Sequence, residues 1–352
     1  MPQIRIGVDI GSTAVRAAEL SMRSIPPRLV RIAQVPLPEG AVGSGEVRDE
    51  QGVAEGLREL WHQGKFRSRE VVLGVANQRV VVREVSLPWM TESELRESLP
   101  FQVQEFVPIA VEDAVLDFHI LEEFEREGRR MVRILLVAAQ KTMIQQLVQA
   151  AEAARLRPVG VDLVPFAIVR SVGMIDGTGL HGTEGGDEAI VDIGADVTSI
   201  CVHAWGVPRF VRILPTGGRD VTAAVARALS VSDDEAEQLK RGGQGGHSQK
   251  RDQALQAALS RAASFADDIR SSLDFYQSQM PGARVERVLL TGGGSKLEGL
   301  ERLLVDRLPS QVAAGHPFHR VSPAIELPDE ATAEAEPLLA VAVGLALPGV
   351  RG

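Results

Sequence analysis

The sequence predicts an α/β protein whose two halves are built alike. Two stretches indicate this, residues 5–20 and residues 189–202. In each, an apolar run ends in Asp-Ile-Gly, a few small or polar residues follow, and another β-rich run begins. This pattern is typical of a strand, a tight turn and a returning strand. The length of 352 residues also fits two domains, each large enough to bury its own core.

The two turns have the composition of an anion-binding backbone. Gly11 and Gly194 let the chain approach a bulky anion closely and direct N–H groups toward it. Nearby hydroxyl groups add hydrogen-bond donors, namely Ser12, Thr13 and Thr198. A P-loop is a different arrangement, because it runs from strand through loop to helix and carries Gly-Lys-Ser/Thr.

An aspartate stands at the end of the first strand in each half. Asp9 and Asp192 are both two residues before the turn glycine. A carboxylate in that place can hold a hydrated Mg²⁺ ion against phosphate oxygens. One Asp-Ile-Gly is a common turn, but two copies in matching contexts favour a shared ligand between the halves.

Composition excludes several classes of protein. The net charge is −9 with acidic residues spread along the chain, which argues against a general nucleic-acid binder. Cys201 is the only cysteine, so an internal disulfide and a cysteine metal cluster are excluded. No signal peptide is visible and no apolar run reaches the ~18 residues of a membrane span. We expect a cytosolic protein without direct membrane insertion, held at a membrane only through a partner.

The first elements in order are three strands, a helix and a strand. Alternating apolar residues predict the strands over residues 3–10, 14–20 and 29–37. Helical spacing over residues 53–62 puts Leu57, Leu60 and Trp61 on one face. A short apolar strand over residues 71–76 follows.

A compact α+β segment comes next. A strand over residues 80–87 ends at Pro88, and Thr91 with Glu94 has capping-box spacing for a helix toward Phe106, which Pro100 should kink or split. Strands over 114–124 and 131–139 and a helix over 141–154 complete this segment. A strand over 157–163 and a helix over 165–172 then return to the first domain.

The second half repeats the opening of the first. Residues 173–187 are glycine-rich and polar and read as a linker, and three strands are expected over residues 189–214. The four glycines within residues 242–249 predict a mobile segment. The other elements are helices over 219–229, 235–241, 252–278 and 296–304, a strand over 285–290, and an irregular segment over 312–328 with one short strand.

The last helix, residues 334–347, is apolar almost all round and carries no Lys or Arg in its apolar part. An interfacial membrane helix has a basic polar face, whereas a helix that is apolar all round is usually buried. We expect this helix to be buried against the second domain.

The two hairpins, together with Leu-Leu-Thr-Gly-Gly-Gly-Ser-Lys-Leu at residues 289–297, resemble the actin-like ATPase superfamily. The resemblance implies two RNase-H-like domains that face each other across a cleft holding ATP. The three stretches match the phosphate-1, phosphate-2 and adenosine segments of that superfamily.

Within the superfamily the chain is similar to the PilM family of type IV pilus assembly. Four sequence segments carry this similarity, at residues 85–88, 105–108, 135–139 and 158–162. PilM and the cell-division protein FtsA have a small subdomain 1C in place of subdomain 1B of actin. The implied division is 1A over 1–76, 1C over 77–155, a return to 1A over 156–173, a linker over 174–187, 2A over 188–230, 2B over 231–284 and a return to 2A over 285–352.

The resemblance also implies which residues touch the nucleotide. Glu237 and Lys240 lie three apart on one helix face, which by itself reads as a surface ion pair, but the matching family segment touches ribose and adenine. Arg16 stands where relatives usually have Lys. The candidate cofactor-binding residues are Gly11, Ser12, Thr13, Arg16, Gly194, Ala195, Thr198, Gly217, Gly218, Glu237, Lys240, Gly292, Gly293 and Gly294, and the candidate Mg²⁺ ligands are Asp9 and Asp192.

One position departs from the family. Where actin-like ATPases carry a Glu or Gln that orients the attacking water, this chain has Val164. Valine cannot bind water, so general-base catalysis worth about 10²–10⁴-fold would be missing. Asp162 is a candidate substitute, because positions two apart on a strand share a face. We therefore expect nucleotide binding with, at most, slow ATPase activity.

The expected function is a cytoplasmic, ATP- and Mg²⁺-binding scaffold at the inner face of the cell membrane. The resemblance implies that its partner is the short cytoplasmic N-terminal tail of PilN, in a groove between 1A and 1C, and extends the candidate partners to pilus motor ATPases. The alternative is a sugar or carboxylate kinase of the same superfamily, which needs an aspartate base facing an acceptor hydroxyl. A third reading is a structural homologue that binds no nucleotide.

Overall fold

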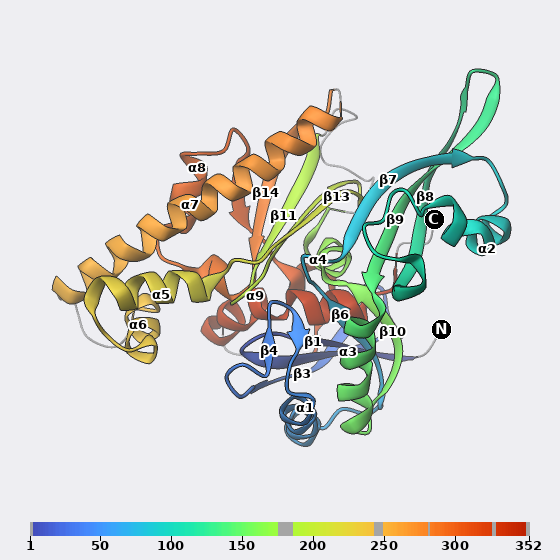
Figure 1. Cartoon of the computed structure of the whole chain (residues 1–352). Coiled ribbons are helices and arrows are strands. Elements are labelled where there is room, and N and C mark those ends of the chain that lie inside the picture. Colours follow the sequence, from blue (N-terminus) through green and yellow to red (C-terminus); the bar gives the residue numbers. More distant parts are fainter. Residues whose placement is uncertain (1–2, 175–185, 243–248, 281, 326–328, 350–352) are drawn as a thin grey trace.

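Two β-sheets with helices on their faces organise the chain in the computed structural model, which describes residues 3–174, 186–242, 249–280, 282–325 and 329–349 (Figure 1). The expected linker and the expected mobile glycine segment lie largely outside these residues. Within them, no helix has both the length and the apolar character needed to span a bilayer.

The first sheet has the strand order β10-β6-β1-β2-β3-β16. The predicted opening is confirmed, because β1 pairs antiparallel with β2, β2 antiparallel with β3, and β6 parallel with β1. The strands are β1 Ile4–Ile10, β2 Ala14–Ser21, β3 Arg28–Pro36, β6 Glu70–Val75, β10 Arg157–Leu163 and β16 Ser322–Pro323. Helices α1 (Glu50–Gly64) and α3 (Lys141–Ala153) pack against this sheet, and α1 buries Leu57 and Leu60 there. A small hairpin of β4 (Val42–Gly43) and β5 (Glu46–Val47) precedes α1.

The second sheet has the order β13-β12-β11-β14-β15 and repeats this arrangement. Its strands are β11 Asp187–Ile193, β12 Thr198–Ala204, β13 Val207–Leu214, β14 Val285–Thr291 and β15 Gln311–Ala314. The long helix α7 (Gln249–Gln279) lies across the sheet and buries Phe265, Ile269 and Leu273 against it. Helices α5 (Gly218–Leu229) and α6 (Asp233–Lys240) extend from the same end of the sheet (Figure 1).

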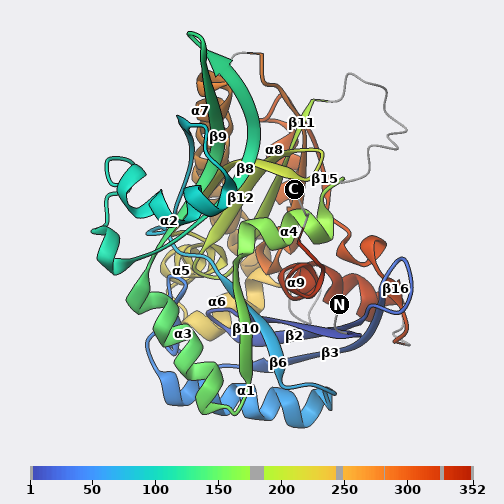
Figure 2. The ribbon, with the colours of Figure 1, turned by 90° about the vertical axis from the view of Figure 1, so that its right-hand side faces the viewer.

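Two buried helices lie in the layer between the sheets (Figure 2). Helix α4 (Val164–Val172) follows the first sheet in the chain but packs against β11, β12 and β13 of the second. Helix α9 (Asp329–Ala346) follows the second sheet but packs mainly against α4, β1 and β2. Burial of the last helix is thus as predicted, but its main partner is the first sheet and not the second domain. The order of elements in the chain cannot show this partner, because each helix packs mainly against the sheet of the other half.

The insertion is a separate layer, with its own sheet in the order β7-β9-β8. The elements are β7 Val81–Pro88, α2 Glu92–Gln102, the 3₁₀ turn η1 Val111–Asp113, β8 Ala114–Arg126 and β9 Arg129–Gln140. The capping box of Thr91 and Glu94 is present at the start of α2. Leu95 and Leu99 of α2 join Val85, Leu87 and Ile134 in one core. Pro100 lies in the last turn of α2, so the helix ends before Phe106.

Two predicted elements differ from the structure near the C-terminus. The helix expected over 296–304 is a 3₁₀ turn, η2 (Gly293–Lys296), followed by the short helix α8 (Leu300–Val305), because Gly299 interrupts it with φ +80°. The irregular segment contains two short strands, β15 and β16, and the 3₁₀ turn η3 (Pro317–Arg320), where one strand was expected. Such short strands exist because they pair with distant strands, and their own few residues carry little pattern that would predict them.

Candidate functional site

A cavity of about 900 Å³ lies between the two halves and is lined from both. The β1–β2 turn and the β11–β12 turn face into it, as do the start of α5, one side of α6 and the glycine turn after β14. All the predicted site residues line the cavity except two, Thr198 and Asp162. The structure therefore brings together residues that are spread from position 9 to position 294.

The two turns have the same hydrogen bond at the same place. The N–H of Gly11 donates to the carbonyl of Ala14 over 3.1 Å, and the N–H of Gly194 donates to the carbonyl of Val197 over 2.9 Å. Both turns close a strand pair in the centre of a sheet, between β1 and β2 and between β11 and β12. The internal repeat in the sequence is thus a repeat of backbone geometry.

The N-terminus of α5 lies against the second turn. The N–H of Gly218 donates to the carbonyl of Gly194 over 2.9 Å. A Cβ at Gly217 would lie 2.5 Å from that same oxygen, so only glycine fits there. Because Asp220 accepts from the N–H of Gly217 over 2.9 Å, this end of the helix is capped from within. The positive end of the helix dipole is directed at the cavity, which favours an anion there.

Asp9 and Asp192 stand close enough within the cavity for their charges to repel. Burial and the charge of Asp9 raise the pKa of Asp192 to about 7. Burial also raises the pKa of Asp9, although Arg16 opposes the shift from 3.5 Å away. Two partly buried carboxylates, one of which raises the pKa of the other, fit a divalent cation, since its charge relieves the repulsion.

The chemistry of this donor set suits Mg²⁺. Among the described residues, no cluster of three or more His, Cys, Asp or Glu side chains could enclose a metal ion. Mg²⁺ is commonly held by one or two carboxylates, with water and phosphate oxygens completing its octahedron. Asp9 and Asp192 would hold such an ion only together with a phosphate ligand.

Arg16 lies in the cavity wall but is not free. Its guanidinium pairs with Asp9, and its Nε donates to Oε1 of Gln34 over 2.8 Å. This geometry makes Arg16 a counter-charge for Asp9. A ligand that binds Asp9 would free Arg16 from this ion pair.

Glu237 and Lys240 belong to a polar cluster and not to an isolated surface pair. Lys240 Nζ pairs with Glu237, donates to Thr222 Oγ1 over 2.8 Å, and donates to the carbonyl of Gly218 over 3.1 Å. Burial alone would raise the pKa of Glu237, but hydrogen bonds from Lys240 and Thr222 outweigh it and lower that pKa. The cluster joins α6 to the start of α5 on the cavity wall.

The glycine turn after β14 must be free of side chains. Gly292 has φ +80°, and a Cβ there would lie 2.5 Å from Asp192 Oδ1. A Cβ at Gly294 would lie 2.3 Å from Ile193 Cγ2. Beside this turn the cavity has an apolar wall that suits a planar ring, formed by Val221, Ala262, Phe265, Leu297 and Leu300.

Thr198 and Asp162 serve other contacts. The hydroxyl of Thr198 is fully buried and donates to the carbonyl of Thr216 over 2.9 Å. Asp162 forms an ion pair with Arg170 of α4 and accepts from its neighbour's N–H. Val164, which stands where a Glu or Gln that orients water was expected, does line the cavity.

Sequence reasoning missed three cations in the cavity wall, Arg219, Arg241 and Lys296. Arg219 pairs with Asp196 in the second turn over 3.0 Å, and Asp196 also accepts from the N–H of Ser44 in the β4–β5 hairpin over 3.5 Å. Arg219 directly follows Gly217-Gly218, which is the signal that could have identified it. The Ser44–Asp196 contact joins the two halves at the cavity.

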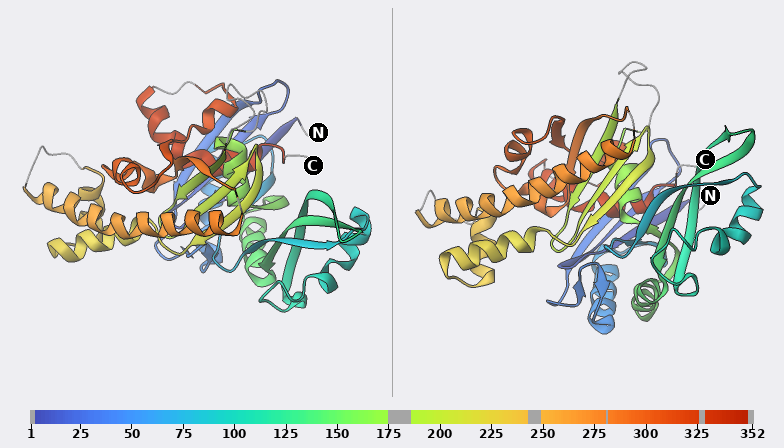
Figure 3. Two further views of the ribbon diagram at one scale, coloured as in Figure 1. Left: turned by 90° about the horizontal axis from the view of Figure 1, so that it is seen from above. Right: turned by 45° about the horizontal axis from the view of Figure 1, so that its top comes forward.

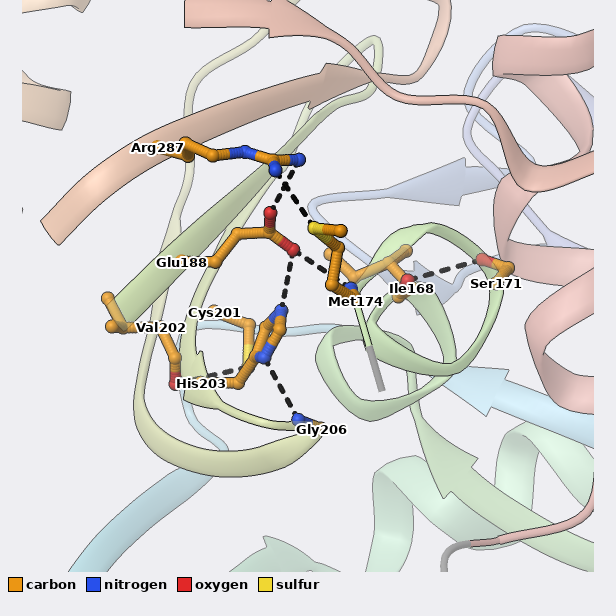
Figure 4. Close-up of polar contacts among 9 residues, drawn as sticks. All are labelled: Ile168, Ser171, Met174, Glu188, Cys201, Val202, His203, Gly206 and Arg287. Atoms are coloured by element: carbon orange, nitrogen blue, oxygen red, sulfur yellow. Dashed lines mark hydrogen bonds and ion pairs between the residues drawn. The ribbon is translucent and has the colours of Figure 1, made fainter. Parts of the chain in front are cut away.

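A second buried polar cluster lies at the other end of β11 (Figure 4). Glu188 accepts from the N–H of Met174, contacts His203 Nε2 over 3.1 Å and pairs with Arg287 over 3.0 Å. His203 Nδ1 accepts from the N–H of Gly206 over 3.2 Å, so both ring nitrogens are used. These contacts tie the end of α4 to β11, β12 and β14 and point to a structural role.

Two sheets of repeated topology with crossed helices between them, and a glycine-lined cavity at their junction, define a protein of the actin-like fold. The chain belongs to the PilM family, since the model of the type IV pilus assembly protein PilM matches residues 7–350. The PilM–PilN type IV pilus biogenesis complex contains a chain with 30% identity and a TM-score of 0.84, covering 100% of both chains.

More distant relatives share the fold. The cell division protein FtsA of Bacillus subtilis (strain 168) is 22% identical over 90% of this chain and 79% of its own length. The ethanolamine utilization protein EutJ of Carboxydothermus hydrogenoformans has a TM-score of 0.55 at 17% identity, covering 98% of this chain and 90% of its own. MreB5 of Spiroplasma citri, bound to ADP, has a TM-score of 0.52 at 11% identity, covering 97% and 94%.

Proposed function

We propose that this member of the PilM family is a scaffold of type IV pilus assembly that binds Mg·ATP between its two halves and the N-terminal tail of a PilN-like protein on its insertion. One observation carries the nucleotide part of this proposal. The two equivalent turns, each preceded by a partly buried aspartate, face the same cavity from opposite sheets. This is the arrangement that a charged ligand with several phosphates requires.

The cavity offers a distinct place for each part of the nucleotide. The phosphates would lie between the two turns, where Gly11 and Gly194 leave the backbone open to close approach and Ser12 and Thr13 offer hydroxyl donors. Asp9 and Asp192 would hold a Mg²⁺ ion beside the phosphates, which would neutralise charge there. The base would rest against the glycine turn and the apolar wall, with Glu237 and Lys240 near the sugar.

Hydrolysis would be slow or absent. Val164 is 6% exposed, lines the cavity and has no group that can orient water. Asp162 is engaged by Arg170, so it is an unsuitable substitute. The nucleotide would then act as a ligand that favours one domain arrangement over another, with slow turnover at most.

The partner part of the proposal rests on the likeness to a chain of the PilM–PilN complex, which extends over the full length. The insertion and the neighbouring edge strand β10 expose apolar side chains suited to an apolar segment of a tail, namely Phe101, Phe106, Val115 and Val159. Binding to a membrane-anchored tail would place the protein on the cytoplasmic side of the inner membrane. The subdomain division given above is proposed with this function, although β16 and α9 of its last part pack on the first sheet.

Calorimetry of the full chain with ATP and ADP in the presence of Mg²⁺ tests the nucleotide part. A pull-down with a synthetic PilN tail peptide, with and without Mg·ATP, tests the partner part. We expect binding in both experiments and a nucleotide-dependent change in the second. The absence of heat for either nucleotide, together with unchanged tail capture by Asp9→Ala, would overturn the proposal.

A further inference from the structure

The insertion touches the second domain as well as the first. Strand β7 of the insertion lies beside β13, the edge strand of the second sheet (Figure 1). A subdomain that contacts both halves of a two-domain protein must respond when the halves move. The residues at this contact therefore decide how such a movement is transmitted.

Glu84 of β7 stands at the contact with an unsatisfied carboxylate. Val85 and Leu87 point into the core of the insertion, so alternation along the strand directs Glu84 away from that core. Its Oε1 is inaccessible to solvent and accepts no hydrogen bond from the described residues. Burial raises the pKa of Glu84, while the charges of Arg209 and Arg133 oppose the shift.

Arg209 of β13 is the cation whose charge acts most strongly on this carboxylate. Arg133, the other nearby cation, is already paired with Glu122 over 2.6 Å. Within the described part of the chain, no salt bridge within 4.0 Å joins Glu84 or Arg209 to any residue. The two charges interact across the junction without the direct contact that would satisfy both.

Two elements lead from this junction to the cavity. Strand β11 carries Asp192 in the cavity wall and Asp187 at its opposite end. Tyr276 of α7 donates to Asp187 Oδ2 over 2.7 Å, and its own pKa is raised by burial and by Asp187 and Glu84, which places it at the same junction.

Helix α7 also lines the cavity with Ala262 and Phe265. Tyr276 is eleven residues farther along, roughly 16 Å at the rise of an α-helix. The C-terminal end of α7 lies on the side of the insertion (Figure 3). Both β11 and α7 are rigid elements, so a shift at the cavity reaches the junction.

We propose that the contact between β7 and β13, centred on Glu84 and Arg209, is the switch through which occupancy of the cavity changes the affinity of the insertion for its partner. The inference rests on the proposed nucleotide and tail binding and specifies the route between them.

The physical basis is a buried oxygen that lacks a donor. Leaving such a group unsatisfied costs free energy, and a small relative shift of β7 and β13 that brings Arg209 into hydrogen-bond range removes the cost. The junction then has two arrangements with different energies. A ligand that draws the halves together selects between them, and the tail bound to the insertion senses the result.

The test measures the affinity of the full chain for the PilN tail peptide with and without a saturating, non-hydrolysable Mg·ATP analogue. Glu84→Gln and Arg209→Gln are compared with the wild type. The matched controls are Glu127→Gln at the exposed β8–β9 turn and Arg227→Gln on the exposed side of α5. Glu84→Gln keeps the shape and removes an unsatisfied charge, so its thermal midpoint should be no lower than that of the wild type.

We expect the analogue to change the tail affinity of the wild type and of both controls by about fivefold or more. In Glu84→Gln and Arg209→Gln this factor should fall to within about twofold of unity, while the affinity for the analogue changes by less than about threefold. The double variant should lose no more coupling than either single variant. Undiminished coupling in both single variants overturns the switch and leaves the proposed function standing. A wild type that binds neither ligand, or binds both without coupling, overturns the proposed function and the switch with it.

Discussion

Gly344 of α9 lies directly against Ala167 of α4. A Cβ at Gly344 would be 1.9 Å from the carbonyl oxygen of Ala167, so the two helices cross with backbone touching backbone. Arg170 of α4 secures the crossing, because its Nε donates to the carbonyl of Gly344 over 2.9 Å. The same helix approaches the first sheet at Gly7, where a Cβ would lie 2.1 Å from the carbonyl oxygen of Ala342. Glycine thus sets the spacing between the two halves.

Gly344→Ala should destabilise the protein. In an ordinary helix the change would stabilise by about 1 kcal/mol, but here the added methyl group meets backbone that no rotamer change can move. We expect a net loss of about 2 kcal/mol or more in the free energy of unfolding, measured by urea titration. Gly349→Ala is the control, since a Cβ there meets nothing within 4 Å. Equal stability of the two variants would show that the helices have room to separate.

Asp192→Asn should remove the contribution of Mg²⁺ to nucleotide binding. The wild type is expected to bind ATP more tightly with Mg²⁺ than with a chelator, because the ion joins the phosphates to the carboxylates. In the variant the two affinities should agree within about twofold, and binding without Mg²⁺ should be no weaker, since one negative charge near the phosphates is gone. Calorimetry measures both. A full Mg²⁺ effect in the variant would exclude Asp192 as a ligand.

Val164→Glu should speed ATP turnover. The wild type is expected to turn over ATP below about 1 s⁻¹, near the low end for enzymes. A carboxylate at this position of the cavity wall can orient water and accept its proton, an effect worth about 10²–10⁴-fold when the geometry is right. An increase of about tenfold or more in phosphate release is therefore expected, with Val164→Leu as the apolar control. If both variants match the wild type, the missing acid does not limit the rate.

Lys240→Met should weaken nucleotide binding. The change removes the ammonium that joins Glu237, Thr222 and the start of α5 on the cavity wall. We expect affinity to fall by about tenfold, equivalent to about 1.4 kcal/mol. Lys250→Met is the control, because Lys250 pairs with Glu235 on the exposed side and does not line the cavity. A similar loss in both variants would assign the effect to charge in general.

The cluster around Glu188 predicts a dependence of stability on pH. Burial would raise the pKa of Glu188, but His203, the N–H of Met174 and Arg287 outweigh it and hold the pKa below the ordinary glutamate value of 4.5. A lowered pKa means that the ionised group stabilises the fold above the unfolded pKa, and that this contribution is lost as pH falls through the folded pKa.

Glu188→Gln should therefore cost most near neutral pH, about 3 kcal/mol for a broken buried pair. The difference from the wild type should shrink as the pH falls below 4.5. Urea unfolding of both proteins between pH 7 and pH 3 measures it. A difference that stays constant over this range would mean that Glu188 acts through packing and not through its charge.

Much of the fold was predictable because its signals are local. The turns at Gly11 and Gly194, the glycine run at Gly292 and the capping box at Thr91 each combine a conformational requirement with residues that satisfy it. The turns at Gly11 and Gly194 and the glycine run at Gly292 also line the cavity, so the residues that shape the backbone there pointed to the site as well.

Other features had no local signal. Thr198 was placed in the site by its position in the turn, but the side chain turns inward to Thr216. Asp162 was offered as a base because it is two residues before Val164, but Arg170 on the next helix engages it. Arg219 was missed because its approach to Asp196 depends on the packing of α5 against the second turn.

The sequence by itself determined two repeated halves, the two turns with their aspartates, and an insertion with its own core, because periodicity and turn chemistry act over a few residues. Only the tertiary structure decided that α4 packs against the second sheet and α9 against the first, that Asp9 and Asp192 meet in one cavity, and that β7 of the insertion lies beside β13. Contacts of this kind join residues far apart in the chain, and they depend on how the sheets and helices pack as whole bodies, which no short stretch encodes.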